Sequence, residues 1–269
     1  MRIRRITLAV LFLLTVLMIA DVRYLGTDLS TNRQSSINFN VDRKAPDFAV
    51  EKQQTFVQPQ NGLTALVVKG QLGTIELTST TENTIKVSAT IGAENQEVLD
   101  RLEVKETVSG SEVRYELTGQ NGEGMAESGV SFVVEIPAGM EASIEQNFGS
   151  IKVDSFVGFL SLDSNFSDVD VRGLEGTATI QSNFSDVDLR QIAGPITLQD
   201  SFSTSTVELL PIDGGYDFDL EVNNGTLKQN VGLKVNRVEK RTLAQGPTGE
   251  GVHPVVIRSS FGTVTVKLD

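Results

Sequence analysis

The chain of 269 residues contains no cysteine and no tryptophan, and its only histidine is His253. Without cysteine it forms no disulfide and no thiolate zinc site, and it has neither a cysteine nucleophile nor a cysteine for lipidation. A single histidine removes most catalytic triads and histidine metal clusters. The fold must therefore be stabilised by packing alone, and the composition does not favour an enzyme.

Basic residues are also scarce. The sequence has 23 Lys and Arg against 35 Asp and Glu, which gives a formal net charge of −12. Such a surface repels nucleic acid and anionic lipid headgroups, because binding to either requires a basic footprint. We therefore expect no nucleic-acid partner. The length allows one large all-β unit or two smaller domains.

The N-terminus has the pattern of a membrane-targeting helix. Residues 1–5 are basic, and residues 6–20 carry no charge. That length lies between the core of a signal peptide and the roughly 20 apolar residues that span a bilayer. Met18 and Ala20 make an imperfect cleavage site, which favours a signal anchor over a signal peptide. We expect a single-pass protein of the cell membrane, with a cytoplasmic N-terminus and an extracytoplasmic C-terminal domain, or a secreted protein if the segment is cleaved.

The next two segments differ in regularity. Residues 21–61 show no sustained period and predict a polar stalk or linker. Residues 62–140 predict the less regular part of a β domain, with a hairpin that turns at Ser109 to Ser111. Within it, Asn95 is a plausible N-cap for a short helix that ends near Leu102.

From residue 141 to residue 269 one motif dominates. Four copies of it place a phenylalanine at equal intervals, at Phe148, Phe166, Phe184 and Phe202. A fixed period with strand-type alternation is typical of a solenoid in which each repeat makes one coil. The predicted fold is therefore all-β, a parallel β-solenoid of roughly 18-residue coils. The motif returns at residues 260–266, which we expect to form the coil that closes the stack.

We aligned the repeats so that their phenylalanines coincide. This alignment predicts which side chains point inward. Five apolar columns result, and three glycines stack at a turn. We expect the phenylalanines to form an internal ladder. Because the separation between phenylalanine and the next apolar position is odd, both face inward only if the chain bends at the small residue after phenylalanine. We also expect a ladder of asparagines just before the phenylalanines. The predicted columns are Ile151, Val169 and Val187; Val153, Val171, Leu189 and Val207; Phe156, Leu174, Ile192 and Leu210; Leu160, Ala178 and Ile196; and Leu162, Ile180 and Leu198.

The outward positions supply the only candidate site, which consists of four carboxylates: Asp168, Asp170, Asp186 and Asp188. A hard divalent cation such as calcium accepts such an oxygen cluster, and a basic partner would also suit it. The alternative is a solvated acidic face that nearby basic residues relieve. Paired acids could also act in a polysaccharide-cleaving β-helix, although the chain lacks the tryptophans that often surround such sites. We expect no catalytic residues and no cofactor, with calcium as the open alternative.

Several short motifs carry a family likeness: GTIEL at residues 73–77, IPAG at 136–139, NFGSIKV at 147–153, NFSDVDV at 165–171 and FGTVTV at 261–266. Together they resemble the putative adhesin domain family of bacterial envelope proteins over about residues 62–269. The resemblance implies a β-strand-repeat domain of largely undefined molecular function. It implies a non-catalytic binding or structural module of the cell envelope, whose partner is an unknown envelope protein or glycan. Two alternatives stay open: an envelope scaffold that self-associates end to end, and a polysaccharide-active enzyme.

Overall fold

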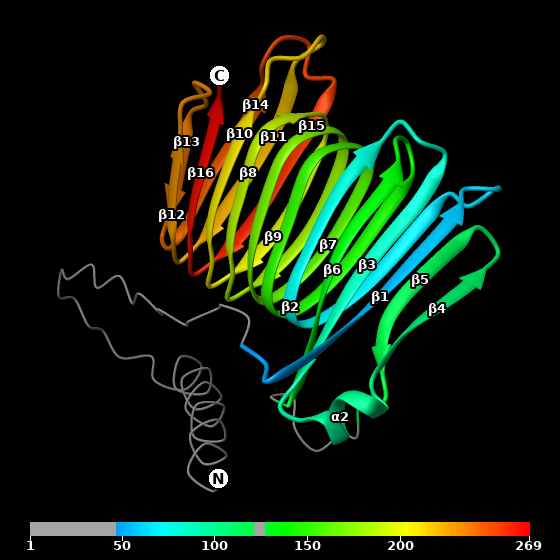
Figure 1. The fold of residues 1–269 in the computed structure, drawn as a ribbon. Helices are drawn as coiled ribbons and strands as arrows, with labels where there is room; N and C mark the ends of the chain where they lie inside the picture. The colour runs from blue at the N-terminus through cyan, green and yellow to red at the C-terminus, as the bar shows by residue number, and fades with distance from the viewer. Residues whose placement is uncertain (1–46, 121–126) are drawn as a thin grey trace, which may run out of the picture. The chain divides into compact units, whose positions relative to one another are not determined.

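The computed structural model describes residues 47–120 and 127–269 (Figure 1). The described part is all-β with one short helix. The predicted membrane-targeting segment at residues 1–20 and the linker as far as residue 46 lie outside the described residues. Within the described ranges, no helix is both long enough and apolar enough to span a bilayer.

Sixteen strands form one mixed, open sheet. The strands of the first half are β1 (Val50–Pro59), β2 (Ala65–Thr80), β3 (Thr84–Ala93), β4 (Glu103–Ser109), β5 (Glu112–Thr118), β6 (Ser128–Pro137) and β7 (Glu141–Asn183). Those of the second half are β8 (Asp186–Ala193), β9 (Ile196–Ser201), β10 (Thr204–Leu209), β11 (Tyr216–Asn223), β12 (Thr226–Gln229), β13 (Val235–Val238), β14 (Arg241–Pro247), β15 (His253–Ser260) and β16 (Thr263–Leu268).

The repeated residues form two rows of parallel strands that share one interior. In the first row the end of β7 pairs with β9, and Ala178 lies beside Ile196. In the second row an earlier part of β7 pairs with β8, and Val169 lies beside Val187. The members of each pair are one repeat apart in the sequence, so the predicted stacking of the repeats is confirmed. Antiparallel strands β1, β3 and β6 continue the second row, and β14 and β13 continue the first row in antiparallel pairing, so the sheet is mixed.

The apolar columns fill the space between the two rows. Every predicted member is buried except Leu210, which is 37% exposed, while Leu209 is fully buried in its place. The earlier repeats carry an extra residue with positive φ before this column, such as Ser155 or Gln191. The last repeat lacks that residue, so Leu209 pairs with Ile192 after a register shift. The prediction for Leu210 was therefore wrong by one residue.

The N-terminal part of the domain begins earlier than expected. Strand β1 lies inside the predicted stalk and pairs with β3 over its whole length. Its Phe56 packs on Tyr115 with 5.1 Å between the ring centroids. The helix α2 (Gln96–Arg101) confirms the predicted N-cap, because Asn95 Oδ1 accepts a hydrogen bond from Val98 N at 3.0 Å. The predicted hairpin is confirmed as β4 and β5.

The C-terminal coil does not close the stack, contrary to expectation. Strand β15 lies between β9 and β11, and β16 lies between β10 and β12. Strands β11 and β12 thus lie one coil further out than the sequence order suggests. The last coil, which consists of β15 and β16, lies between them and the coil of β9 and β10. The outer end is formed by the four-residue strand β12 and by the antiparallel strands β14 and β13 (Figure 1). Short and antiparallel strands blunt an edge against further pairing.

The predicted glycine stack is confirmed at the turn between the two rows. Gly158, Gly176 and Gly194 all have φ between 142° and 145°, a region that side chains rarely adopt. A Cβ on Gly176 would lie 2.0 Å from the carbonyl oxygen of Gly158 in the neighbouring coil. Glycine is therefore required both by backbone conformation and by the close approach of the coils.

We predict that Gly176→Ala lowers the free energy of unfolding by about 3 kcal/mol or more, because it adds a backbone clash to the strain of about 1 to 2 kcal/mol from positive φ. Gly62→Ala is the matched control, since Gly62 has φ +86° and no atom within 4 Å of its ideal Cβ. Urea denaturation of both variants measures the difference. Equal losses would contradict the close packing of the coils at this turn.

Candidate functional site

A column of five phenylalanines runs along one corner of the stack. Neighbouring ring centroids are 4.9–5.1 Å apart, and the ring planes agree within 7°. This phenylalanine ladder consists of Phe148, Phe166, Phe184, Phe202 and Phe261. It includes one ring more than the sequence period predicted, because the inserted C-terminal coil places Phe261 next to Phe202.

The ladder lies on the outside of the corner, which corrects the expectation that it is internal. Phe202 and Phe261 are each 43% exposed, and the other three rings are partly buried. The bend lies at the phenylalanine itself, whose φ is between 53° and 62°, and not at the following small residue. That residue points inward instead, as the buried Ser167, Ser185 and Ser203 show.

The inward serines satisfy the backbone at the bend. Ser167 N donates to Ser185 Oγ at 3.2 Å, and Ser185 N donates to Ser203 Oγ at 3.4 Å. Each hydroxyl of one coil thus accepts from an amide of the neighbouring coil, which the bend would otherwise leave without a partner. A serine is small enough to fit there, so outward phenylalanine and inward serine are two parts of one corner structure.

Positive φ is unusual for a residue as large as phenylalanine. Asn224, which follows Phe261 in the same corner column, has φ 53° and belongs to the type that tolerates this conformation best. The left-handed backbone costs about 1 to 2 kcal/mol per phenylalanine. Beyond the burial of the rings, stacking returns about 0.5 to 1.5 kcal/mol per ring pair, so stacking does no more than offset this strain.

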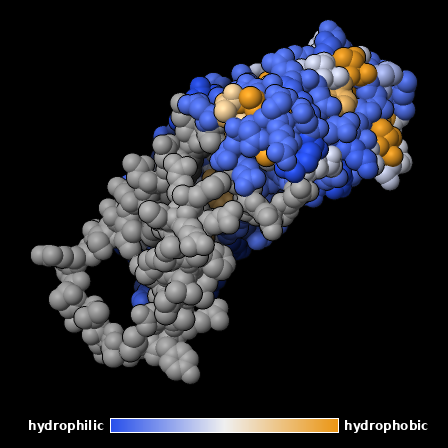
Figure 2. Space-filling model, turned by 60° about the horizontal axis from the view of Figure 1, so that its bottom comes forward, coloured by the Kyte–Doolittle hydropathy of each residue, from blue (hydrophilic) through white to orange (hydrophobic). Residues whose placement is uncertain are grey.

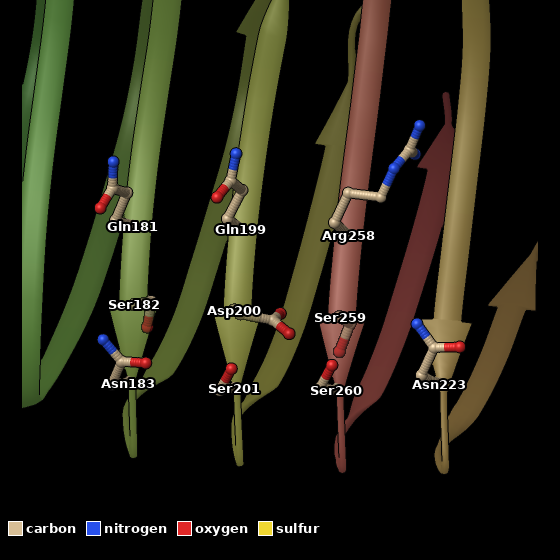
Figure 3. Close-up of a pocket in the computed structure, with 10 residues that line it drawn as sticks. All are labelled: Gln181, Ser182, Asn183, Gln199, Asp200, Ser201, Asn223, Arg258, Ser259 and Ser260. Carbon is tan, nitrogen blue, oxygen red and sulfur yellow. The ribbon is translucent and has the colours of Figure 1, made fainter. Parts of the chain in front are cut away.

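Next to the ladder, the outer side of the first row contains a polar hollow of about 260 Å³ (Figure 3). Its cause is a difference in side-chain size. Ser201 and Ser260 are adjacent in register, with Asn183 beside Ser201 and Asn223 beside Ser260. Two small residues thus lie between two amides. The residues that line the hollow are Gln181, Ser182, Asn183, Gln199, Asp200, Ser201, Asn223, Arg258, Ser259 and Ser260.

The same two serines explain which rings are exposed. Ser201 and Ser260 immediately precede Phe202 and Phe261, the two most exposed members of the ladder. An asparagine precedes each of the other three rings. Of the predicted asparagine ladder, one contact is confirmed: Asn183 Nδ2 donates to Asn165 Oδ1 at 3.1 Å. The hollow and the exposed rings therefore have a common origin.

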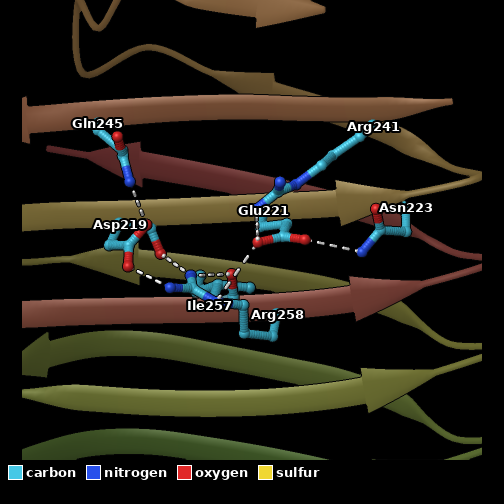
Figure 4. A network of polar contacts seen from close by, with 7 residues as sticks. All are labelled: Asp219, Glu221, Asn223, Arg241, Gln245, Ile257 and Arg258. Carbon is cyan, nitrogen blue, oxygen red and sulfur yellow. Dashed lines mark hydrogen bonds and ion pairs between the residues drawn. The ribbon is translucent and has the colours of Figure 1, made fainter. Parts of the chain in front are cut away.

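An ion network holds the only basic side chain that lines the hollow, Arg258 (Figure 4). Its guanidinium forms an ion pair with Asp219 and donates to the Asp219 carbonyl oxygen at 2.7 Å. Glu221 lies 3.7 Å from Arg258 Nε and 2.7 Å from an Arg241 nitrogen. The hydrogen bond from Arg258 lowers the pKa of Asp219, and the hydrogen bond from Arg241 lowers the pKa of Glu221. Two cations and two anions compensate each other here.

Asp200 is a buried carboxylate in a column of serines. It lies beside Ser182 and Ser259 in register and accepts a hydrogen bond from the Ser205 hydroxyl. Its other oxygen, Asp200 Oδ1, has no partner within the described residues. Burial raises the pKa of Asp200, and the hydroxyls of Ser205 and Ser259 only partly oppose that shift. The Ser259 hydroxyl lies near the carboxylate but makes no hydrogen bond of good geometry to it. In Figure 3 its side chain points away from those of Gln181 and Gln199, toward the interior.

The structure brings two of the four predicted carboxylates together. Asp170 and Asp188 are register neighbours on β7 and β8. Each forms an ion pair with the arginine two residues further on, Arg172 and Arg190 respectively. Asp168 and Asp186 lie two positions before them. No three acidic or histidine side chains of the described ranges form a group that could hold a metal ion. The cation site at these four residues stays a prediction.

Sequence reasoning missed the hollow, the buried Asp200 and the Arg258 network. For the hollow and for the buried Asp200, the sequence contained a signal. Ser201 and Ser260 replace asparagine before phenylalanine, and Asp200 stands one repeat after Ser182 in an inward column. The sequence contained no signal for the Arg258 network. This network joins β11, β14 and β15, and the position of β15 beside β11 depends on the inserted last coil.

No protein-family model matches the sequence, and no curated protein matches it. Among solved structures, the chain is similar to a putative cell adhesion protein from Clostridium sporogenes, with 12% identity and a TM-score of 0.43 over 82% of this chain and 100% of that one. It is also similar to a putative adhesin from Bacteroides fragilis, with 11% identity and a TM-score of 0.40 over 81% of this chain and 97% of that one. These similarities are too distant to assign this chain to a family.

We predict that Asp200→Ser raises the free energy of unfolding by about 1 to 2 kcal/mol at about pH 8, because it removes a buried carboxylate oxygen without a partner. The folded state raises the pKa of Asp200 above the ordinary 3.8, so ionisation opposes folding above the raised pKa. That penalty decreases as the pH falls below the raised pKa and is absent once the pH lies clearly below the ordinary 3.8, so the difference between variant and wild type should vanish at about pH 3.

Urea denaturation at both pH values measures this effect. Asp217→Ser is the control, because Asp217 is exposed on strand β11 and its removal should change stability little at either pH. A gain that is the same at both pH values would show that Asp200 ionisation is not its cause.

Proposed function

We propose that this chain is a membrane-anchored, extracytoplasmic β-solenoid that acts as a non-catalytic, adhesin-like binding module in the bacterial cell envelope. Residues 6–20 would hold it in the membrane with the N-terminus in the cytoplasm, and the β domain would lie outside. If the segment is cleaved, the same domain is secreted. Its partner is a component of the envelope.

The parallel repeats support the solenoid interpretation. Positions one repeat apart pair in register in both rows, so each coil contacts mainly its two neighbours. A stack of this kind presents the same outward position repeatedly along one line. Outward side chains then form a regular array on a firm support, which suits the recognition of an extended or repetitive partner.

The phenylalanine ladder is the observation that carries the binding role. Five bulky residues adopt a strained backbone conformation that Asn224 adopts more easily in the same column. Two of the rings are substantially exposed, and the ladder gains little net stability from its stacking. Strained residues and exposed apolar groups are concentrated at sites of interaction. On the face shown in Figure 2, hydrophobic residues form separate patches within a mostly hydrophilic surface.

The two alternatives have less support. For a polysaccharide-active enzyme, the candidate acids Asp170 and Asp188 are already engaged by arginines; that alternative requires glycan turnover which Asp168→Asn or Asp186→Asn abolishes. For an end-to-end scaffold, the short β12 and the antiparallel β13 offer poor surfaces for adding another parallel coil. That alternative requires filaments or a mass that increases with concentration.

We predict that the double variant Phe202→Asn, Phe261→Asn weakens binding to bacterial envelope fractions at least about tenfold, because it removes the two most exposed rings. Asparagine suits the left-handed backbone, as Asn224 does in this column, so the fold should persist. Co-sedimentation of the purified full chain with envelope fractions measures binding, and circular dichroism checks the fold.

Val238→Asn is the matched control, since Val238 is 64% exposed on the edge strand β13 and belongs to no ladder. Its binding should equal that of the wild type. An equal loss in the control would point to non-specific apolar adsorption, and unchanged binding of the double variant would refute a role for the ladder.

A further inference from the structure

We infer that the polar hollow beside the ladder is a subsite for one neutral sugar unit of an envelope polysaccharide. This inference rests on the proposed binding function and names the chemical class of its ligand. The hollow lies on the outer side of β7, β9, β15 and β11, where Gln181, Gln199 and Arg258 line up on adjacent strands (Figure 3).

Unused hydrogen-bonding capacity is the first argument. Within the described ranges, the side chains of Gln181, Gln199, Ser201 and Ser260 make no hydrogen bond to the rest of the protein. Asn183 and Asn223 each use the side-chain nitrogen, toward Asn165 and Glu221, and keep a carbonyl oxygen. Amides and hydroxyls supply both donors and acceptors in one small area. A sugar ring needs this combination, because each of its hydroxyls both donates and accepts.

Charge supports a neutral ligand over an ionic one. The guanidinium of Arg258 is held by Asp219 and Glu221, and Arg241 balances the second carboxylate (Figure 4). The hollow therefore offers no uncompensated cation to an acidic glycan, and the chain's net charge of −12 repels one further. The ion network fixes Arg258 as part of a preformed rim.

Shape and aromatic neighbours complete the argument. The serine floor leaves a hollow of about 260 Å³, which is enough for one ring and not for a large ligand. Phe202 and Phe261 directly follow the two floor serines in the chain. Because ladder neighbours cover both faces of Phe202 and one face of Phe261, a sugar above the floor serines would meet mainly ring edges. The aromatic contribution is therefore modest, and hydrogen bonds with low individual strength must supply most of the binding.

A shallow, wet subsite of this kind should bind one unit weakly, with a Kd on the order of 1 mM. Useful attachment then depends on several contacts along a polymer, since linked weak sites raise the overall avidity. A repetitive polysaccharide offers several sugar units in a row, and on the solenoid the hollow lies next to the ladder, so one polymer could contact both.

The test is titration of the ¹⁵N-labelled full chain with neutral, N-acetylated and acidic oligosaccharides, followed through the side-chain amide signals of Gln181, Gln199 and Asn183. We expect these signals to shift with neutral oligosaccharides, N-acetylated ones included, at a Kd of about 1 mM. Acidic oligosaccharides should bind more weakly.

The variant Ser201→Asn, Ser260→Asn fills the hollow with the residue type already present at Asn183 in the same register column, so it should fold normally. We expect it to weaken oligosaccharide binding at least about tenfold. Thr265→Asn on β16 of the opposite row is the control and should bind like the wild type.

Three results would overturn the subsite: no shift of these amides, an unchanged affinity in the filled variant, or a preference for acidic oligosaccharides. If envelope fractions bind the wild type while oligosaccharides do not, the sugar subsite is wrong and the binding function stands; capture of an envelope protein in that case identifies the other class of partner. If envelope fractions do not bind either, the proposed function itself fails.

Discussion

The in-register pairing of the repeats is the constraint on which the rest of the structure depends. Backbone hydrogen bonds between coils place equivalent residues beside one another, as Val169 and Val187 show. Apolar positions then become continuous columns, and a turn residue such as Gly176 has the carbonyl oxygen of the next glycine against it. Nothing bulky fits at such a turn. The same pairing brings phenylalanine rings within 4.9–5.1 Å of one another, so the ladder follows from the backbone and does not create it.

The corner determines what lies on each side of the sheet. A positive φ at Phe166 turns its ring outward and turns Ser167 inward. There the Ser167 hydroxyl donates a hydrogen bond to the backbone carbonyl oxygen of Asn165. The interior near this corner is polar as a result, while the rest of the core is apolar. Asp200 occupies a position in that polar region where the preceding coil has Ser182, and burial raises its pKa. The corner therefore explains both an exposed aromatic column and a buried carboxylate.

The period determined how much of the fold could be predicted. Columns such as Leu162, Ile180 and Leu198 follow from spacing alone, and all three are buried. Spacing could not determine whether Phe166 faces inward with a bend at Ser167 or outward with a bend at Phe166 itself, because the odd separation from Val169 is compatible with both arrangements. It also could not place the last coil, since strand neighbours usually follow sequence order. The hollow depends on side-chain sizes on β7, β9, β15 and β11. The serines before Phe202 and Phe261 were a signal for it, but spacing could not show that these serines are adjacent, because their adjacency depends on the inserted coil.

The inserted coil connects fold and candidate function. If β11 paired directly with β9, Asn223 would lie beside Ser201 and the floor of the hollow would be a single serine. Because β15 lies between β9 and β11, Ser260 adds a second serine to the floor of the hollow, and Arg258 becomes part of its rim. The same insertion places Phe261 on Phe202 and Thr263 beside Thr204, so it extends both rows at once. The hollow, its ion network and the most exposed rings thus all depend on the coil that the chain inserts last. This is the part of the surface where the regular array is interrupted by residues of different size and charge, and a recognition site needs such an interruption to distinguish one partner from another.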